Sequence, residues 1–88
     1  SERSFDELQQ RIARVQALLE GFTPERFAGS DTREIVITPG GTEMRFPGGA
    51  DYLHRFAMPN FMFHVVTAYA ILRHNGVEIG KRDFIGAV

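Results

Sequence analysis

The side chains with the clearest potential for chemistry in this 88-residue chain are three histidines, His54, His64 and His74. Imidazole nitrogens are good ligands for Zn²⁺ and Ni²⁺, and histidine also transfers protons near neutral pH. Successive histidines are separated by ten positions, about 15 Å along a straight helix, so one ion cannot bind two of them on a single helix. The chain has no cysteine, and it shows no Ser-His-Asp set and no converging pair of carboxylates.

Asn60 and His64 are the remaining pair with a suitable spacing, because they lie one helical turn apart. At about 100° per residue they share an apolar stripe with four other positions: Leu53, Ala57, Thr67 and Ile71. One interpretation is a site in which His64 and Asn60 hold a metal ion or a small ligand, or in which His64 acts in acid–base chemistry. The other is a buried hydrogen-bonded network, which is the commoner role of a single histidine on an apolar face.

The other two histidines have simpler explanations. His54 stands beside Arg55 and is expected at the surface or at a kink. His74 lies in the last turn of the predicted helix, where a positive charge suits the helix dipole. Neither histidine is expected to act as a ligand.

The pair must be positioned by a long helix predicted over residues 49–75, between Gly49 and a stop at Gly76. Pro59 lacks an N–H and clashes with the carbonyl four residues earlier, that of Arg55, so we expect a kink in this region. This helix is apolar around most of its circumference. Such a helix belongs in the interior of a bundle or an oligomer.

A second amphipathic helix is predicted over residues 4–20. Ser4 and Glu7 match the S-x-x-E capping box, and Gly21 is a typical stop. One narrow apolar seam runs along this helix, formed by Phe5, Leu8, Ile12, Val15 and Leu19.

The segments between and after the helices are predicted from turn residues. Residues 21–33 form a loop that includes one helical turn over 23–27, with Phe22 and Phe27 holding the loop to the core. Two short β-prone runs within residues 34–46 lie on either side of the turn residues Pro39-Gly40-Gly41, and this pattern predicts a β-hairpin. One face of this hairpin carries Ile35, Ile37, Met44 and Phe46. The tail, residues 76–88, is expected to be extended and anchored by Ile79 and Phe84.

Composition limits the classes of partner. The net charge is −1 and no basic tract occurs, which argues against nucleic acid or an anionic membrane as a partner. Polar residues interrupt the apolar helix, so no transmembrane span is expected. No signal peptide is recognisable, and we expect a cytoplasmic protein. Two helices cannot bury both apolar faces of the long helix over residues 49–75. The chain is therefore expected to be half of a bundle, completed by a second copy in a homodimer or by a missing N-terminal half.

A resemblance covers nearly the whole chain. The strings Phe56 to His64, Thr67 to Gly76 and Gly80 to Phe84, together with shorter matches at 33–36, 46 and 51–53, resemble the C-terminal half of a bacterial family of unknown function. That family is placed in the DinB/YfiT-like superfamily of metalloenzymes. The resemblance implies half of a DinB-like four-helix bundle, here two helices with a small β-hairpin between them, with the family's first two helices outside this chain.

The same resemblance bears on the site. Members of the superfamily bind a divalent metal, often Ni or Zn, through three histidines, two of them in an H-x-x-x-H pair on the third helix. By position, Asn60 and His64 match that pair, with Asn60 in place of the first histidine. The resemblance thus implies a metal site at His64 and Asn60, and no particular enzymatic reaction. The alternative is a non-catalytic oligomeric bundle in which the pair is a structural polar network.

Overall fold

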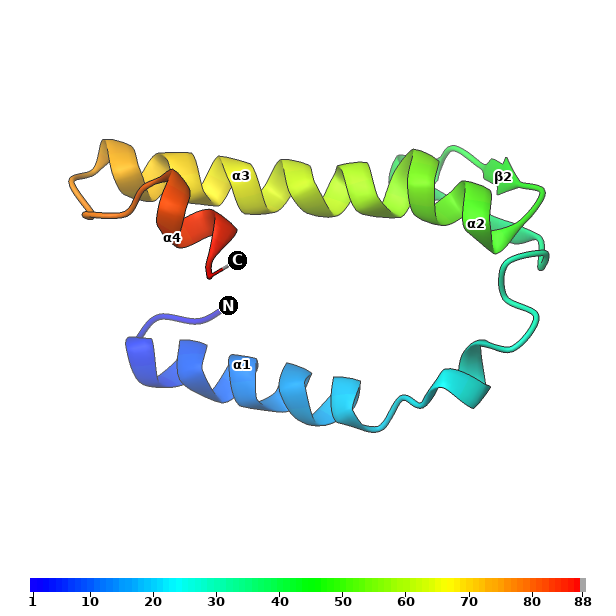
Figure 1. The fold of residues 1–88 in the computed structure, drawn as a ribbon, viewed down its shortest axis with the longest axis horizontal. Helices are drawn as coiled ribbons and strands as arrows, with labels where there is room; N and C mark the ends of the chain where they lie inside the picture. The colour runs from blue at the N-terminus through cyan, green and yellow to red at the C-terminus, as the bar shows by residue number, and fades with distance from the viewer. Residues whose placement is uncertain (88) are drawn as a thin grey trace.

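The computed structural model describes residues 1–87 and consists of two long helices joined by a loop and a small hairpin (Figure 1). The predicted mainly helical class with one two-stranded antiparallel sheet is confirmed. None of the helices described has both the length and the apolar character needed to cross a membrane. The elements are α1 (Phe5–Glu20), η1 (Pro24–Phe27), β1 (Ile35–Ile37), η2 (Pro39–Gly41), β2 (Met44–Phe46), α2 (Gly49–Tyr52), η3 (Leu53–Ala57), α3 (Met58–His74) and α4 (Lys81–Ile85).

Helix α1 begins where the capping pattern predicts. The Ser4 hydroxyl accepts a hydrogen bond from the Glu7 amide at 3.1 Å. The Glu7 carboxylate accepts from the amide of Arg3 and not from that of Ser4, so the capping box is formed one residue out of its usual register. The helix ends at Glu20, before Gly21, as predicted, although Gly21 has φ −75° and so does not take the left-handed conformation common at a glycine stop. The helix ends in a tightened turn, with the Gly21 amide donating to the Leu18 carbonyl.

The loop after α1 contains the predicted helical turn, η1. Phe22 and Phe27 pack against each other with ring centroids 5.9 Å apart, and the guanidinium of Arg26 lies 4.5 Å above the Phe22 ring. Both rings remain about half exposed. Phe27 also lines a hollow with Ile35 and Tyr52, so it lies beside the hairpin and α2.

The hairpin supplies the best-buried residue of the chain. Its antiparallel register pairs Ile35 with Phe46 and Ile37 with Met44, which places these four side chains on one face as predicted. Phe46 is only 4% exposed. Its ring lies 5.5 Å from that of Tyr52 and 6.2 Å from that of Phe56, and these three rings form the aromatic cluster that joins the hairpin to the helix.

We expected a kink near Pro59, and the structure has a π-helical segment, η3, just before this proline. A π-turn is one of the ordinary ways in which a helix accommodates an interruption of its hydrogen bonds. Figure 1 shows α2, η3 and α3 following one another along one continuous rod. The rod ends as predicted at Gly76 (φ 93°). There the amides of Gly76 and Val77 donate to the carbonyls of Arg73 and Leu72, respectively, which is a complete Schellman motif.

The prediction of an extended tail is wrong, because residues 81–85 form the short helix α4. The Asp83 carboxylate accepts from the Gly80 amide at 2.8 Å and caps this helix. The tail is anchored by Phe84 as predicted, with its ring edge-to-face with Tyr69 at 5.2 Å. The Tyr69 hydroxyl donates to the Gly80 carbonyl. Tyr69 thus holds α4 against α3.

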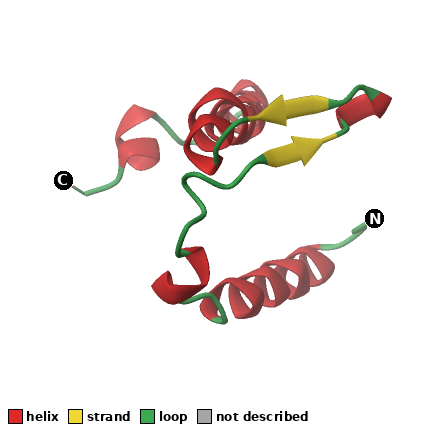
Figure 2. Ribbon diagram, turned by 90° about the vertical axis from the view of Figure 1, so that its right-hand side faces the viewer, coloured by secondary structure: helices red, strands yellow, loops and turns green. Residues whose placement is uncertain are grey.

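The two long helices do not pack against each other. Figures 1 and 2 both show α1 apart from α3, and the packing between elements is concentrated around the hairpin, α2, η3 and α3. The radius of gyration is 16.7 Å, against about 12 Å for a compact domain of this length. The accessible area is 7897 Å², against about 5200 Å² for a folded monomer of this mass. The chain is open, and the apolar side chains of α1 and α3 are largely exposed.

Candidate functional site

Asn60 and His64 lie on α3 one turn apart, as predicted, and both are exposed in the single chain. Among residues 1–87, neither side chain has a hydrogen-bond partner within the protein. His64 contacts its neighbour Phe63, with the two rings edge-to-face at 5.5 Å. The pair therefore keeps its full capacity to bind another group.

The face of α3 that carries the pair is opposite to the face that carries α4. At about 100° per residue, Tyr69 lies about 140° and Arg73 about 180° around the helix from His64. A hollow of about 220 Å³ lies on that opposite side, lined by Val66, Tyr69, Arg73, Lys81 and Phe84. Since α4 occupies the far side of α3, it leaves the side with Asn60 and His64 uncovered.

The three histidines are not brought together. His54 lies in η3 and His74 is the last residue of α3, so both are on the same rod as His64 and one ten-residue step away from it. In the part of the chain that the structure describes, no group of three His, Cys, Asp or Glu side chains is arranged to hold a metal ion. A metal at His64 therefore needs ligands from outside this chain.

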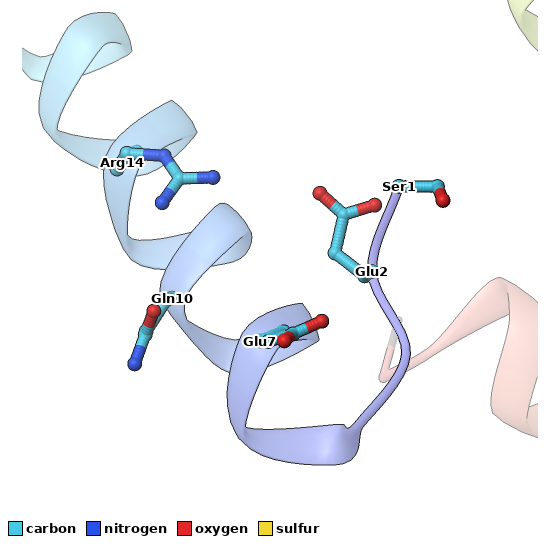
Figure 3. Close-up of a pocket in the computed structure, with 5 residues that line it drawn as sticks. All are labelled: Ser1, Glu2, Glu7, Gln10 and Arg14. Carbon is cyan, nitrogen blue, oxygen red and sulfur yellow. The ribbon is translucent and has the colours of Figure 1, made fainter.

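Acidic residues at the N-terminus line a second hollow, of about 210 Å³, which Figure 3 shows. Its lining includes Glu2, Glu7 and Arg14. The Glu2 carboxylate forms an ion pair with Arg11, which lowers the pKa of Glu2 below its usual value. The Glu7 carboxylate caps α1. Both carboxylates have partners within the chain, and among the described residues neither belongs to a group of three ligands arranged to hold a metal ion.

Sequence reasoning missed the role of Tyr69 and the helix α4 that it holds. A signal was present, because Asp83 follows Gly80 by three positions, the spacing at which an acidic side chain caps a helix start. Helix α4 has only five residues, which is too short for a hydrophobic period to be recognised. Its position matters for the site because it determines which face of α3 stays open.

Comparisons with known proteins identify the family and leave its function open. Residues 1–85 match the sequence profile of a family described as "Domain of unknown function (DUF1993)". No curated protein and no solved structure matches the chain. Because the match covers almost the whole chain, the chain belongs to the DUF1993 family.

Proposed function

We propose that this DUF1993 member is a bacterial cytoplasmic helical-bundle protein of the DinB-like type, in which Asn60 and His64 bind a divalent metal ion, Ni²⁺ or Zn²⁺. The observation that carries the proposal is the pair itself. It consists of two polar side chains, one turn apart and without protein partners among the described residues, on the uncovered apolar face of α3. Closing the bundle over that face would bury both groups.

Once buried, the pair needs a ligand or a hydrogen-bonding partner. A buried polar group that loses its water without gaining a partner costs about 1–3 kcal/mol. Of the other residues on the stripe, Leu53, Ala57 and Ile71 are apolar, and Thr67 carries one hydroxyl. A metal ion satisfies a neutral imidazole at about 2.0–2.1 Å, and the Asn60 amide oxygen could take a second position.

The donor set of one chain is incomplete for such an ion. Zinc sites in proteins generally have at least three protein ligands, and this chain offers one imidazole and one amide at the pair. Further helices must therefore provide the remaining ligands when the bundle closes. A metal held with one open position would polarise a bound water or a small ligand. The substrate class is not specified by these residues.

The second candidate function is a non-catalytic bundle in which Asn60 and His64 are a structural polar network. The absence of a three-ligand group among residues 1–87 favours it, because an amide is a weak ligand for a transition metal. In that case His64 would hydrogen-bond a side chain or carbonyl of a facing helix. Such a network would fix the packing of the assembly.

Metal analysis of histidine variants separates the two functions. After loading with Zn²⁺ or Ni²⁺ and dialysis, we expect the wild-type protein and His74→Ala to retain the ion and His64→Ala to lose it. His74 is the matched control, because it is an exposed histidine on the same helix. A structural network predicts instead that none of the three retains metal, and that His64→Ala lowers the free energy of unfolding by about 1–3 kcal/mol.

A further inference from the structure

The turn that ends α3 contains the dipeptide Asn75-Gly76, and both residues are exposed. The backbone nitrogen of the next residue can attack an asparagine side chain. The attack is fastest before glycine, which has no side chain to hinder it and the widest choice of backbone conformation. The other asparagine of the chain, Asn60, is followed by the bulky Phe61 within α3. Asn75 is therefore the asparagine in the reactive sequence context.

The folded turn holds the two reacting groups apart. The Asn75 side-chain amide donates to the Ile71 carbonyl at 2.7 Å, which ties this side chain to the last turn of α3. The Gly76 amide donates to the Arg73 carbonyl at 3.0 Å. Asn75 has ψ 12°, so the Gly76 nitrogen nearly eclipses the Asn75 backbone nitrogen and is turned away from its Cβ. The closed turn therefore prevents the attack that the sequence favours.

A second contact fastens the same segment at its other end. The Gly80 carbonyl accepts a hydrogen bond from the Tyr69 hydroxyl. The ring of Phe84 in α4 packs edge-to-face on Tyr69 at 5.2 Å. Residues 75–80 are thus attached to α3 both by the Schellman motif and by the docked helix α4. Undocking of α4 would leave only the Schellman motif, and the ends of helices open at low free energy.

We propose that Asn75 is a deamidation site that stays closed while α4 is docked on α3. In the open turn, the Gly76 nitrogen loses its proton to water and forms a bond with the Asn75 Cγ. The bond from Cγ to the side-chain nitrogen breaks, and this nitrogen takes up a proton and leaves as ammonia. Water then opens the resulting succinimide ring on either side of its nitrogen and gives aspartate or isoaspartate at position 75. This chemistry depends only on local contacts within residues 69–84.

The product does not fit the closed turn. A carboxylate cannot donate to the Ile71 carbonyl, and its negative charge lies at the negative end of the helix dipole. Isoaspartate also adds one atom to the main chain, which displaces the Val77 amide from the Leu72 carbonyl that it contacts at 3.1 Å. Deamidation at Asn75 therefore favours the undocked state of α4.

Peptide mass spectrometry tests the proposal. Trypsin places the two asparagines in different peptides, because it cleaves after Arg55, Arg73 and Lys81. The protein is incubated at neutral pH with and without guanidinium chloride, and the fraction of each peptide that carries a carboxyl group in place of the amide is followed with time. We expect Asn75 to react at least about tenfold faster in the denaturant than in the native protein. Asn60 should react more slowly than Asn75 in the denaturant.

Two variants test the role of α4 in the native protein. Phe84→Ala removes the ring that packs on Tyr69, and Tyr69→Phe removes only the hydrogen bond to Gly80. Both should raise the native rate at Asn75 by about threefold or more. Phe5→Ala is the control, because it truncates a ring on α1 that is 87% exposed, and it should leave the rate unchanged.

Two results would overturn the site itself: equal rates at Asn75 with and without denaturant, or no modification of Asn75 in either condition. Wild-type rates in both Phe84→Ala and Tyr69→Phe, with each variant shown to be folded by circular dichroism, would overturn the role of α4.

Discussion

Replacing Gly49 with alanine should destabilise the fold by about 2–4 kcal/mol, combining steric overpacking with the loss of a hydrogen bond. A methyl group on Gly49 would lie 1.9 Å from the carbonyl oxygen of Ser30, so the backbone must move. At this close contact between the loop and the start of α2, the Ala50 amide donates to the Asp31 carbonyl at 3.1 Å. Alanine is the better helix former by about 1 kcal/mol, but the steric cost is larger. The net effect is destabilising.

Gly21→Ala is the control for this change. Its new methyl group would lie 3.4 Å from the nearest backbone atom, which is an ordinary contact, and the backbone there is already helical. We expect its unfolding free energy to stay within about 0.5 kcal/mol of wild type. Denaturant unfolding at one fixed protein concentration measures both variants. Equal stability of Gly49→Ala and Gly21→Ala would show that the Ser30 backbone does not lie against Gly49.

Truncating Phe46 to alanine should cost about 3–5 kcal/mol, the usual range for a buried phenylalanine. Phe46 is the only buried hydrophobic residue among residues 1–87, and its ring contacts both Tyr52 and Phe56. Its loss removes the centre of the aromatic cluster that attaches the hairpin to the rod.

Val36→Ala provides the comparison for Phe46→Ala, because Val36 lies on the other face of the same hairpin and is 44% exposed. It should cost less than about 1 kcal/mol. The two variants are compared by thermal and denaturant unfolding. A loss of under about 1 kcal/mol for Phe46→Ala would contradict the aromatic cluster as the core of this chain.

Local signals in the sequence predicted much of the fold. The Ser4 cap, the hairpin face and the Gly76 stop each depend on residues within a few positions of one another. The disturbance before Pro59 could be predicted for the same reason, since the proline removes a specific hydrogen bond. That it would take the form of a π segment depends on how the neighbouring turns relax.

Features that depend on distant contacts were not predictable. The packing of α4 requires Tyr69 on another helix, and the contact between Phe22 and Phe27 depends on how the loop folds. The candidate pair could be placed on one face from its spacing alone. Its exposure could not, because it depends on how the other elements pack around α3.

The most direct test of the proposed metal site is the ratio of bound metal to chain in the assembled protein. The protein is saturated with Zn²⁺, separated by size-exclusion chromatography, and analysed for mass and metal in the same peak. The account predicts a fixed ratio of Zn²⁺ to chain in the wild-type protein, and no Zn²⁺ in His64→Ala at unchanged mass. A metal-free wild-type assembly, or the same ratio in His64→Ala, would contradict it.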